Sequence, residues 1–218
     1  NSPTILKKRF VDSISQSKVI GSYIFNDEML NKQDEKKLND ILDNEIKKHD
    51  LVIVSDYGHG FISKKIAGTI CKKSNFLALN AQVNASNIGY HTIANYKNFS
   101  TLIINEKEIR HEMRDKNSKT EFLMKKLSVE KNIQNLVVTK GEKGSIMYHK
   151  NKNKFYYSAA FAHKVLDKVG AGDTMLALVA PCLKSKINVE IALLIGALAA
   201  AQSVETIGNK HSIDKLKM

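Results

Sequence analysis

The sequence predicts an α/β fold with a mostly parallel sheet, and three observations carry this prediction. Short, continuous apolar runs recur along the chain, and stretches with helical periodicity separate them. Such runs are typical of strands that helices cover on both faces. Polar loops that contain glycine follow several runs, and this is where open parallel sheets bind ligands. With 218 residues, 43% of them hydrophobic, the chain is long enough to form one large domain with a buried core.

The alternation begins in the first third of the chain. Residues Ser17 to Phe25 have the composition of a strand and lead into a turn. A helix is expected from about Gln33 to Lys48, because its apolar residues fall on one face. The run Leu51 to Val54 predicts a strand buried on both sides. A helix from about Ser63 to Lys73 and a strand from Phe76 to Leu79 follow.

The same rhythm continues after an Asn-rich segment, Asn80 to Tyr96. Two further strands and two helices are predicted, over Leu102 to Ile104, Glu106 to Met113, Thr120 to Leu127 and Leu136 to Thr139. Strand after helix after strand implies parallel strands with helices on both faces of the sheet.

Past Thr139 the pattern changes. A tight glycine turn precedes two short strands, Ser145 to Tyr148 and Lys154 to Tyr157, which predict an antiparallel hairpin. A helix that ends near Leu183 comes next. The last helix, from about Val189 to Thr206, is rich in Ala and Gly, and small residues let helices pack closely in a core.

The segment Asp167-Lys168-Val169-Gly170-Ala171-Gly172-Asp173-Thr174 is the strongest functional feature, because an apolar run follows it directly. It predicts a loop that enters a helix. Backbone amides at Gly170, Ala171 and Gly172, together with the helix dipole, would stabilise an anion such as a phosphate. A carboxylate beside such a site suggests a base, so Asp173 is the candidate that removes a proton from an attacking hydroxyl. The alternative is a glycine turn with an Asp or Thr N-cap.

Three other loops follow predicted strands and would reach the same rim of the sheet. Asp56 and Gly58 follow the first of these strands. Asn105 and Glu108 follow another, where Glu108 would hold water or Mg²⁺, although a simple capping box fits the same spacing. The glycine turn after the last parallel strand would contact a nucleotide or form an ordinary hairpin turn. Its candidate residues are Thr139, Gly141 and Gly144.

Taken in order, N-x-x-E, T-x-G-x-x-G and D-x-x-G-A-G-D resemble the motifs of the ribokinase-like (PfkB) carbohydrate kinases, from about Asp50 to the C-terminus. The resemblance implies a three-layer α/β/α fold and ATP with Mg²⁺ as cofactors. It implies Asp173 as base on a sugar hydroxyl, an anion hole at residues 170–172, and a Mg²⁺ and water site at Asn105 and Glu108. Thr139 and Gly141 would contact ATP, and Gly208-Asn209 would line the adenine pocket.

Upstream residues are similar to the kinase domain of bifunctional heptose-phosphate kinase/nucleotidyltransferase proteins. The residues that carry this likeness are Pro3-Thr4, Lys7, Arg9 and the loop Ser55 to Gly60. His59 stands where those kinases typically carry Lys, and the segment around Asn84 is richer in amides. The resemblance implies a sugar or sugar-phosphate substrate near Asp56, Gly58 and Asn84. It brings a fused or separate nucleotidyltransferase domain and a homodimer into consideration.

The chain is expected to be one kinase domain that is truncated at its N-terminal side, since family members place about a hundred residues before this start. Residues 1–32 would form a lid or sheet-edge segment, and residues 33–218 the nucleotide-binding core. A kinase-like module that binds a nucleotide or phosphosugar without catalysis is the alternative.

Composition limits the other function classes. The formal net charge is +12, but lysines are scattered over many polar faces rather than clustered, so no nucleic-acid partner is expected. No apolar run approaches the ~20 residues that span a bilayer, and no signal-peptide pattern is present, so the cytoplasm is the expected location without a membrane partner. Cys71 and Cys182 have no metal-ligand spacing.

Overall fold

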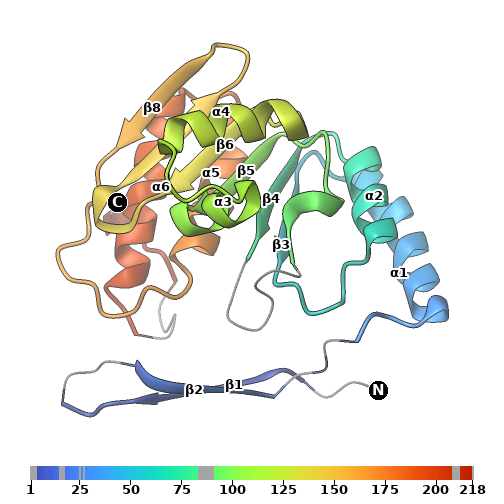
Figure 1. The fold of residues 1–218 in the computed structure, drawn as a ribbon, viewed down its shortest axis with the longest axis horizontal. Coiled ribbons are helices and arrows are strands. Elements are labelled where there is room, and N and C mark those ends of the chain that lie inside the picture. The colour runs from blue at the N-terminus through green and yellow to red at the C-terminus, as the bar shows by residue number, and fades with distance from the viewer. Residues whose placement is uncertain are drawn as a thin grey trace.

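The structure is a computed structural model that describes residues 4–14, 18–24, 26, 28–82, 91–207 and 212–217. Its main body is a six-stranded sheet with helices on both faces, and a two-stranded ribbon lies beneath it in the view of Figure 1. This arrangement confirms the predicted α/β class and its three layers.

The sheet has its strands in sequence order. The strands are β3 (Val52–Asp56), β4 (Leu77–Ala81), β5 (Thr101–Asn105), β6 (Asn135–Thr139), β7 (Ser145–His149) and β8 (Lys154–Ser158). Strands β3 to β6 are parallel, and β7 and β8 are antiparallel to their neighbours, as the change of rhythm past Thr139 predicts. The first strand ends two residues later than the apolar run indicates, so Asp56 belongs to β3 and not to the loop.

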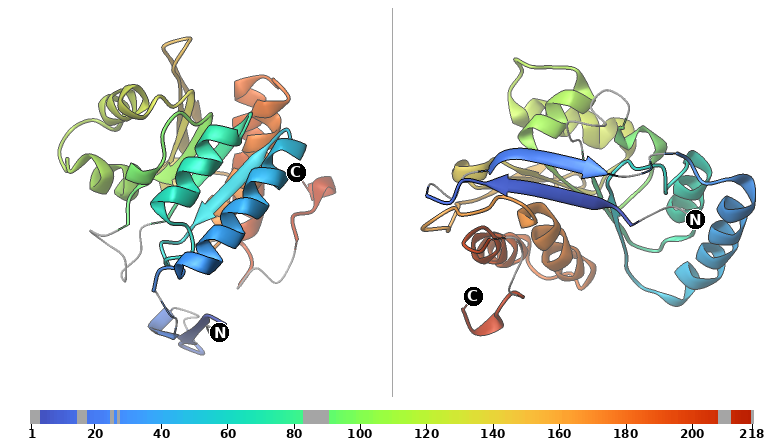
Figure 2. Two further views of the ribbon diagram at one scale, coloured as in Figure 1. Left: turned by 90° about the vertical axis from the view of Figure 1, so that its right-hand side faces the viewer. Right: turned by 90° about the horizontal axis from the view of Figure 1, so that it is seen from below.

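Six α-helices among the described residues cover this sheet. They are α1 (Lys32–Glu45), α2 (Lys64–Lys73), α3 (Glu106–Met113), α4 (Thr120–Lys131), α5 (Ala171–Lys184) and α6 (Val189–Val204). Figure 2 shows α5 and α6 on one face, with the other four helices on the opposite face. Asn and Ser side chains cap several helix starts, as at Asn31, Ser63 and Asn188, and so satisfy amides that have no partner within the helix.

Successive strand residues alternate between two apolar cores, one on each face of the sheet. On β4, Leu77 and Leu79 pack into the core under α1 to α4, whereas Ala78 faces α5 and α6. On β6, Leu136 and Val137 divide in the same way. Both faces are covered, so the strands are apolar throughout instead of alternating with polar residues.

Helices α5 and α6 approach each other closely at Gly196. A Cβ atom at this position would lie 2.4 Å from the Cγ2 atom of Val179, so a larger residue requires the Val179 side chain or the helices to move. The abundance of small residues in α6 is therefore a packing requirement, as the sequence indicates.

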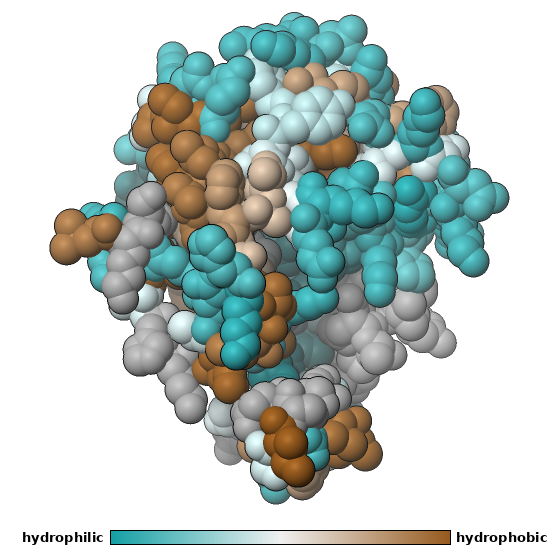
Figure 3. Space-filling view, turned by 90° about the vertical axis from the view of Figure 1, so that its left-hand side faces the viewer, coloured by the Kyte–Doolittle hydropathy of each residue, from teal (hydrophilic) through white to brown (hydrophobic). Residues whose placement is uncertain are grey.

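The ribbon consists of β1 (Leu6–Val11) and β2 (Lys18–Ile24), paired antiparallel. The strand predicted from Ser17 to Phe25 is present, and its partner β1 is not predicted from the sequence. Apolar side chains on the ribbon are exposed, and Figure 3 shows brown residues at its end, at the bottom of that view. The exposed apolar residues include Phe10, Val11, Val19, Ile20 and Ile24.

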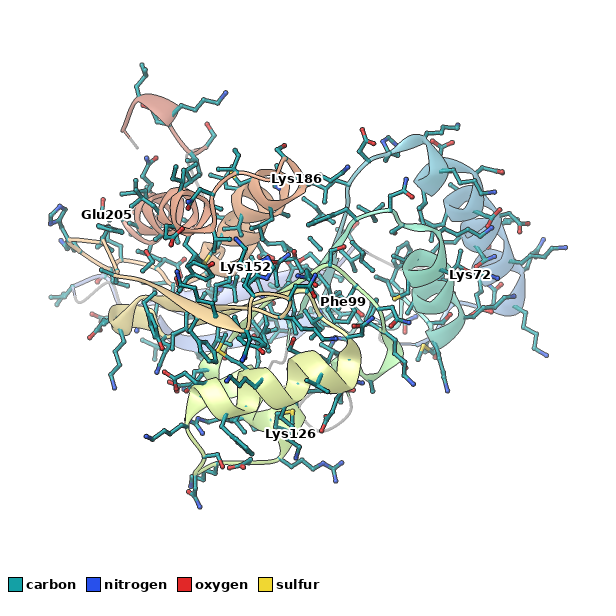
Figure 4. All side chains as sticks on the ribbon, turned by 90° about the horizontal axis from the view of Figure 1, so that it is seen from above. Lys72, Phe99, Lys126, Lys152, Lys186 and Glu205 are labelled. Atoms are coloured by element: carbon teal, nitrogen blue, oxygen red, sulfur yellow. The ribbon has the colours of Figure 1, made fainter. Side chains whose placement is uncertain are left out.

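The basic residues are distributed over separate elements. Figure 4 labels Lys72 on α2, Lys126 on α4, Lys152 in the β7–β8 turn and Lys186 after α5, each in a different part of the view. Among the described residues, no helix is long and apolar enough to cross a membrane.

Candidate active site

Helix α5 begins directly after a glycine. Gly170 precedes the helix with φ 89° and ψ −12°, a left-handed conformation that favours glycine. None of the described side chains caps this helix, and the Thr174 amide donates to the Gly170 carbonyl at 2.8 Å. A Cβ atom at Gly172 would meet nothing within 4 Å among the described atoms. The first-turn amides therefore have no side-chain cap among the described residues, and helix amides of this kind can bind an anion.

Asp173 lies in this first turn, and two hydroxyl groups hold its carboxylate. The Ser55 hydroxyl donates to Oδ1 at 2.9 Å, and the Tyr57 hydroxyl donates to Oδ2 at 3.1 Å. Ser55 is the second-last residue of β3, and Tyr57 follows that strand directly. The structure thus joins the carboxyl end of β3 to the start of α5, two segments more than a hundred residues apart in sequence.

Tyr57 is a partly buried phenol with an aromatic face toward the ribbon. Burial raises the pKa of Tyr57, and the Asp173 charge raises it further, so the hydroxyl remains a donor at neutral pH. The Lys7 ammonium lies 5.1 Å from the centre of the Tyr57 ring, within the range of a cation–π interaction. The ribbon is therefore in contact with the site through Lys7.

Asp56 is a buried residue at the carboxyl end of β3. Its side chain is buried on the opposite face of β3 from Ser55, because successive strand residues point to opposite faces. The Tyr96 hydroxyl donates to it at 2.6 Å and the Gly58 amide at 3.0 Å. Both donors bind the carboxylate from within the protein, and the expected contact of Asp56 with a substrate stays a prediction. Gly58 has φ 68°, and this conformation belongs to the turn from which its amide donates to the Asp56 carboxylate.

Asn105 and Glu108 form the capping box that the sequence leaves as an alternative. The Glu108 amide donates to Asn105 Oδ1, and the Asn105 amide donates to Glu108 Oε2, each at 2.8 Å. Glu108 is 6% exposed. One oxygen of its carboxylate is therefore occupied by the backbone, which limits how much of it a metal ion could use.

The turn after β6 contains two glycines with positive φ, at 60° for Gly141 and 77° for Gly144. A Cβ atom at Gly144 would lie 1.9 Å from the Ser158 carbonyl oxygen, so this glycine is required by the hairpin itself. A Cβ atom at Gly141 would meet nothing within 4 Å among the described atoms. Of the two glycines, Gly141 is therefore the one with room for a ligand beside it.

Thr139 and Asn105 are direct neighbours at the carboxyl ends of β6 and β5. Beyond them, the Lys140 ammonium lies 3.6 Å from the Glu106 carboxylate. A hydrogen bond from Thr120, with help from the charges of Lys140 and Arg110, holds the pKa of Glu106 below its usual range. This charged pair is not predicted from the sequence, because Glu106 and Lys140 each have the local pattern of an exposed polar residue.

The candidate residues at the strand ends therefore share one edge of the sheet, as predicted for parallel strands. Helix α5 packs on β3, β4 and β5 and brings Asp173 to that edge. Ser55 and Tyr57 are the site residues that the sequence analysis misses. Their signal is the two-residue spacing around Asp56, which places both on the face opposite its carboxylate. Three predicted site residues, Asn84, Gly208 and Asn209, lie outside the described residues.

No dedicated metal cage is found in the part of the chain that the structure describes, where no three His, Cys, Asp or Glu side chains come together in a metal-binding cluster. Magnesium does not need such a cage, since it keeps several waters and binds one or two carboxylates together with substrate phosphates. Glu108, with one carboxylate oxygen bonded to the Asn105 amide, is the residue at this edge that would order such an ion through water.

Solved structures of carbohydrate and nucleoside kinases have the same fold. Ribokinase from Thermotoga maritima superposes with a TM-score of 0.74 at 22% identity, covering 98% of this chain and 67% of that protein. Arabidopsis thaliana ribokinase in complex with ribose and ATP gives a TM-score of 0.69 at 20% identity, covering 100% of this chain and 67% of its own. These similarities show the ribokinase-like three-layer fold.

Sequence relatives include bacterial proteins named bifunctional protein HldE. The protein from Aliarcobacter butzleri is 28% identical over 213 residues, which is 96% of this chain and 43% of that protein. The protein from Campylobacter concisus is 32% identical over 162 residues, 72% of this chain and 33% of that protein. The chain thus spans less than half the length of these relatives. Residues 23–216 match the family model described as pfkB family carbohydrate kinase, and the chain belongs to that family.

Proposed function

We propose that this chain forms part of a kinase that transfers the γ-phosphoryl group of ATP to a hydroxyl of a sugar or sugar phosphate. The observation that supports it best is the position of Asp173 in the first turn of α5, with its carboxylate held by Ser55 and Tyr57. A proton acceptor and a group of uncommitted helix amides then lie within one turn of each other.

In the proposed step, the acceptor hydroxyl lies between Asp173 and the γ-phosphorus. The hydroxyl oxygen forms a bond to phosphorus while the bond between phosphorus and the bridging oxygen of ADP breaks. The hydroxyl proton passes to the Asp173 carboxylate. The amides of residues 170–172 stabilise the charge that develops on the transferring group, and a well-placed donor of this kind contributes about 3 to 4 kcal/mol.

The nucleotide would lie along the carboxyl ends of β5 and β6. Thr139 and the open side of Gly141 are available to its ribose and phosphates. Mg²⁺ supplies charge neutralisation on the phosphates when bound, and Glu108 would order it through water. Gly208-Asn209 would line the adenine pocket.

The acceptor that we favour is a heptose phosphate, from the resemblance to heptose-phosphate kinase domains. The HldE relatives are named bifunctional proteins, so we propose that a second, nucleotidyltransferase unit accompanies this domain in the whole protein. In the proposed division of the chain, residues 1–32 act as a lid and residues 33–218 as the core. The contact of Lys7 with Tyr57 supports this lid, because it brings the ribbon to the site. The cytoplasm is the proposed location.

The proposal is tested by ADP release from MgATP, measured on the complete natural protein with a heptose phosphate, fructose 6-phosphate and ribose as acceptors. We expect acceptor-dependent ADP release, its loss in Asp173→Asn, and unchanged ATP affinity of that variant by calorimetry. Asp40→Asn, an exposed carboxamide substitution on α1, is the matched control and should keep full activity. ATP binding without acceptor-dependent ADP release would favour a binding module that lacks catalysis.

A further inference from the structure

The two hydroxyl donors on Asp173 come from one short segment at the end of β3. Ser55 donates to Oδ1 and Tyr57 to Oδ2, so each carboxylate oxygen has its own donor. We propose that Ser55 and Tyr57 are positioning residues that fix the plane of the Asp173 carboxylate for proton acceptance. This inference rests on the proposed function and assigns two residues to it beyond the base and the anion hole.

A donor on each oxygen has a specific mechanical effect. The final torsion of an aspartate side chain is broad, so a carboxylate without partners samples many orientations. One hydrogen bond restrains one oxygen, whereas a bond to each oxygen restrains the plane of the group. Each carboxylate oxygen has about two lone-pair sites, so both keep acceptor capacity for a substrate hydroxyl.

The backbone that carries the two donors is itself fixed by contacts in the sheet and on its buried face. Ser55 is paired within the sheet, and Asp56, on the opposite face, receives hydrogen bonds from Tyr96 and from the Gly58 amide. These bonds anchor the backbone between the two donors from the buried side. Donors on a rigid element transmit a defined geometry, which a mobile loop would not.

The chemistry of Tyr57 fits a permanent donor better than a proton carrier. Burial and the Asp173 charge raise the pKa of its phenol, so its proton stays in place at neutral pH. The Lys7 ammonium over its ring further restrains the ring position. In the competing interpretation, the Tyr57 hydroxyl only occupies the position of the acceptor hydroxyl until the acceptor displaces it. That interpretation predicts a changed KM for the acceptor and an unchanged kcat in Tyr57→Phe.

The decisive experiment compares Tyr57→Phe, Ser55→Ala and Ser55→Thr in the complete natural protein, with the acceptor that supports ADP release. We expect kcat to fall at least about tenfold in Tyr57→Phe and in Ser55→Ala, since a misplacement of about 1 Å near a reacting group costs roughly a hundredfold. The KM values for ATP and acceptor should stay within about threefold, because neither side chain is assigned to hold a substrate. Ser55→Thr keeps the hydroxyl and should recover most of kcat.

Two control variants separate positioning from general stability. Tyr148→Phe removes a tyrosine–asparagine bond in the β7–β8 hairpin, outside the segment that carries the donors, and it should lower the Tm while kcat per folded molecule stays near wild type. Tyr157→Phe, at an exposed position on β8, should change neither.

The outcomes distinguish the two levels of the proposal. Unchanged kcat in both Tyr57→Phe and Ser55→Ala, with an active wild type, would overturn the positioning role alone. A raised KM for the acceptor with unchanged kcat would also overturn it, because it would make these residues substrate contacts. A wild type that phosphorylates none of the acceptors would remove the proposed function, and the positioning role with it.

Discussion

The hydroxyl of Ser55 lies 2.9 Å from the Oδ1 atom of Asp173, although 118 residues separate the two in the chain. This contact ties the edge strand of the sheet to the first turn of α5. The family to which the chain belongs and the arrangement of this site together support a phosphoryl-transfer function. Other contacts in the fold lead to predictions on the start of α5, the packing of α5 on α6, the capping box of α3 and the half-buried His149.

Gly172→Ala should separate stability from activity. A Cβ atom at Gly172 clashes with no described atom, and Ala favours a helix over Gly by up to about 1 kcal/mol. The variant should therefore unfold at the same or a higher temperature. Its methyl group would occupy the space in which a phosphate approaches the amides, so kcat/KM for ATP should fall about tenfold or more. Normal activity in a well-folded Gly172→Ala protein would contradict an anion hole here.

Gly196→Ala should destabilise the fold by about 1 to 3 kcal/mol, because the new methyl group overlaps Val179 on α5. Gly68→Ala is the matched control, since Gly68 is also helical and a Cβ atom there meets nothing within 4 Å. Both substitutions gain the same helix propensity, and only Gly196→Ala meets a neighbour. In chemical denaturation, Gly68→Ala should therefore be more stable than wild type and Gly196→Ala less stable. Equal stabilities of the two variants would show that α5 and α6 accommodate the methyl group without a measurable cost.

Glu108→Gln should test whether the Glu108 carboxylate does more than cap α3. Glutamine serves in a capping box as well as glutamate, so the free energy of unfolding should change by less than about 0.5 kcal/mol. The charge is lost, so the Mg²⁺ concentration needed for half-maximal turnover should rise. Glu108→Ala should also raise this Mg²⁺ concentration and, because it removes the capping box, lower the free energy of unfolding. A Gln variant with wild-type Mg²⁺ dependence would reduce Glu108 to a structural role.

His149 should make stability fall in mildly acidic solution. Burial lowers the pKa of His149 below its ordinary value of 6.5, with a smaller contribution from the Lys152 charge. The unfolded chain therefore binds the proton first as the pH falls. The stabilisation is present above pH 6.5 and is lost as the pH drops through the lower folded pKa.

Denaturation of wild type and His149→Gln at about pH 7.5 and about pH 5.5 measures this linkage. The variant should lose less stability between the two pH values than wild type does. An equal loss in both proteins would assign the effect to other groups.

Much of the fold could be predicted because both faces of the sheet are covered. The apolar runs and the helical periodicity between them indicate β3 to β6 and their helices, with ends shifted by a few residues. Strand β1 could not be predicted, because its consecutive residues Lys7, Lys8 and Arg9 obscure any alternation and the ribbon has no buried face. Its pairing depends on β2 and not on burial.

The site was predictable at the level of loops and not of side chains. The motifs place the right segments at one edge, but the side on which each residue of Ser55-Asp56-Tyr57 points depends on where β3 ends. Ending the strand at Val54 makes Asp56 a free loop residue. The observed end at Asp56 turns its carboxylate toward Tyr96 and presents Ser55 and Tyr57 to Asp173. Long-range contacts of this kind leave no local pattern.

The most direct test of the central claim is a single-turnover measurement of phosphoryl transfer in wild type and Asp173→Asn, with ATP and acceptor both saturating. Loss of a positioned base lowers the rate by about 10² to 10⁴. We predict a fall in this range for Asp173→Asn, with ATP affinity and Tm near wild type. Transfer at the wild-type rate by the folded Asn variant would contradict a base at Asp173 and, with it, the proposed mechanism.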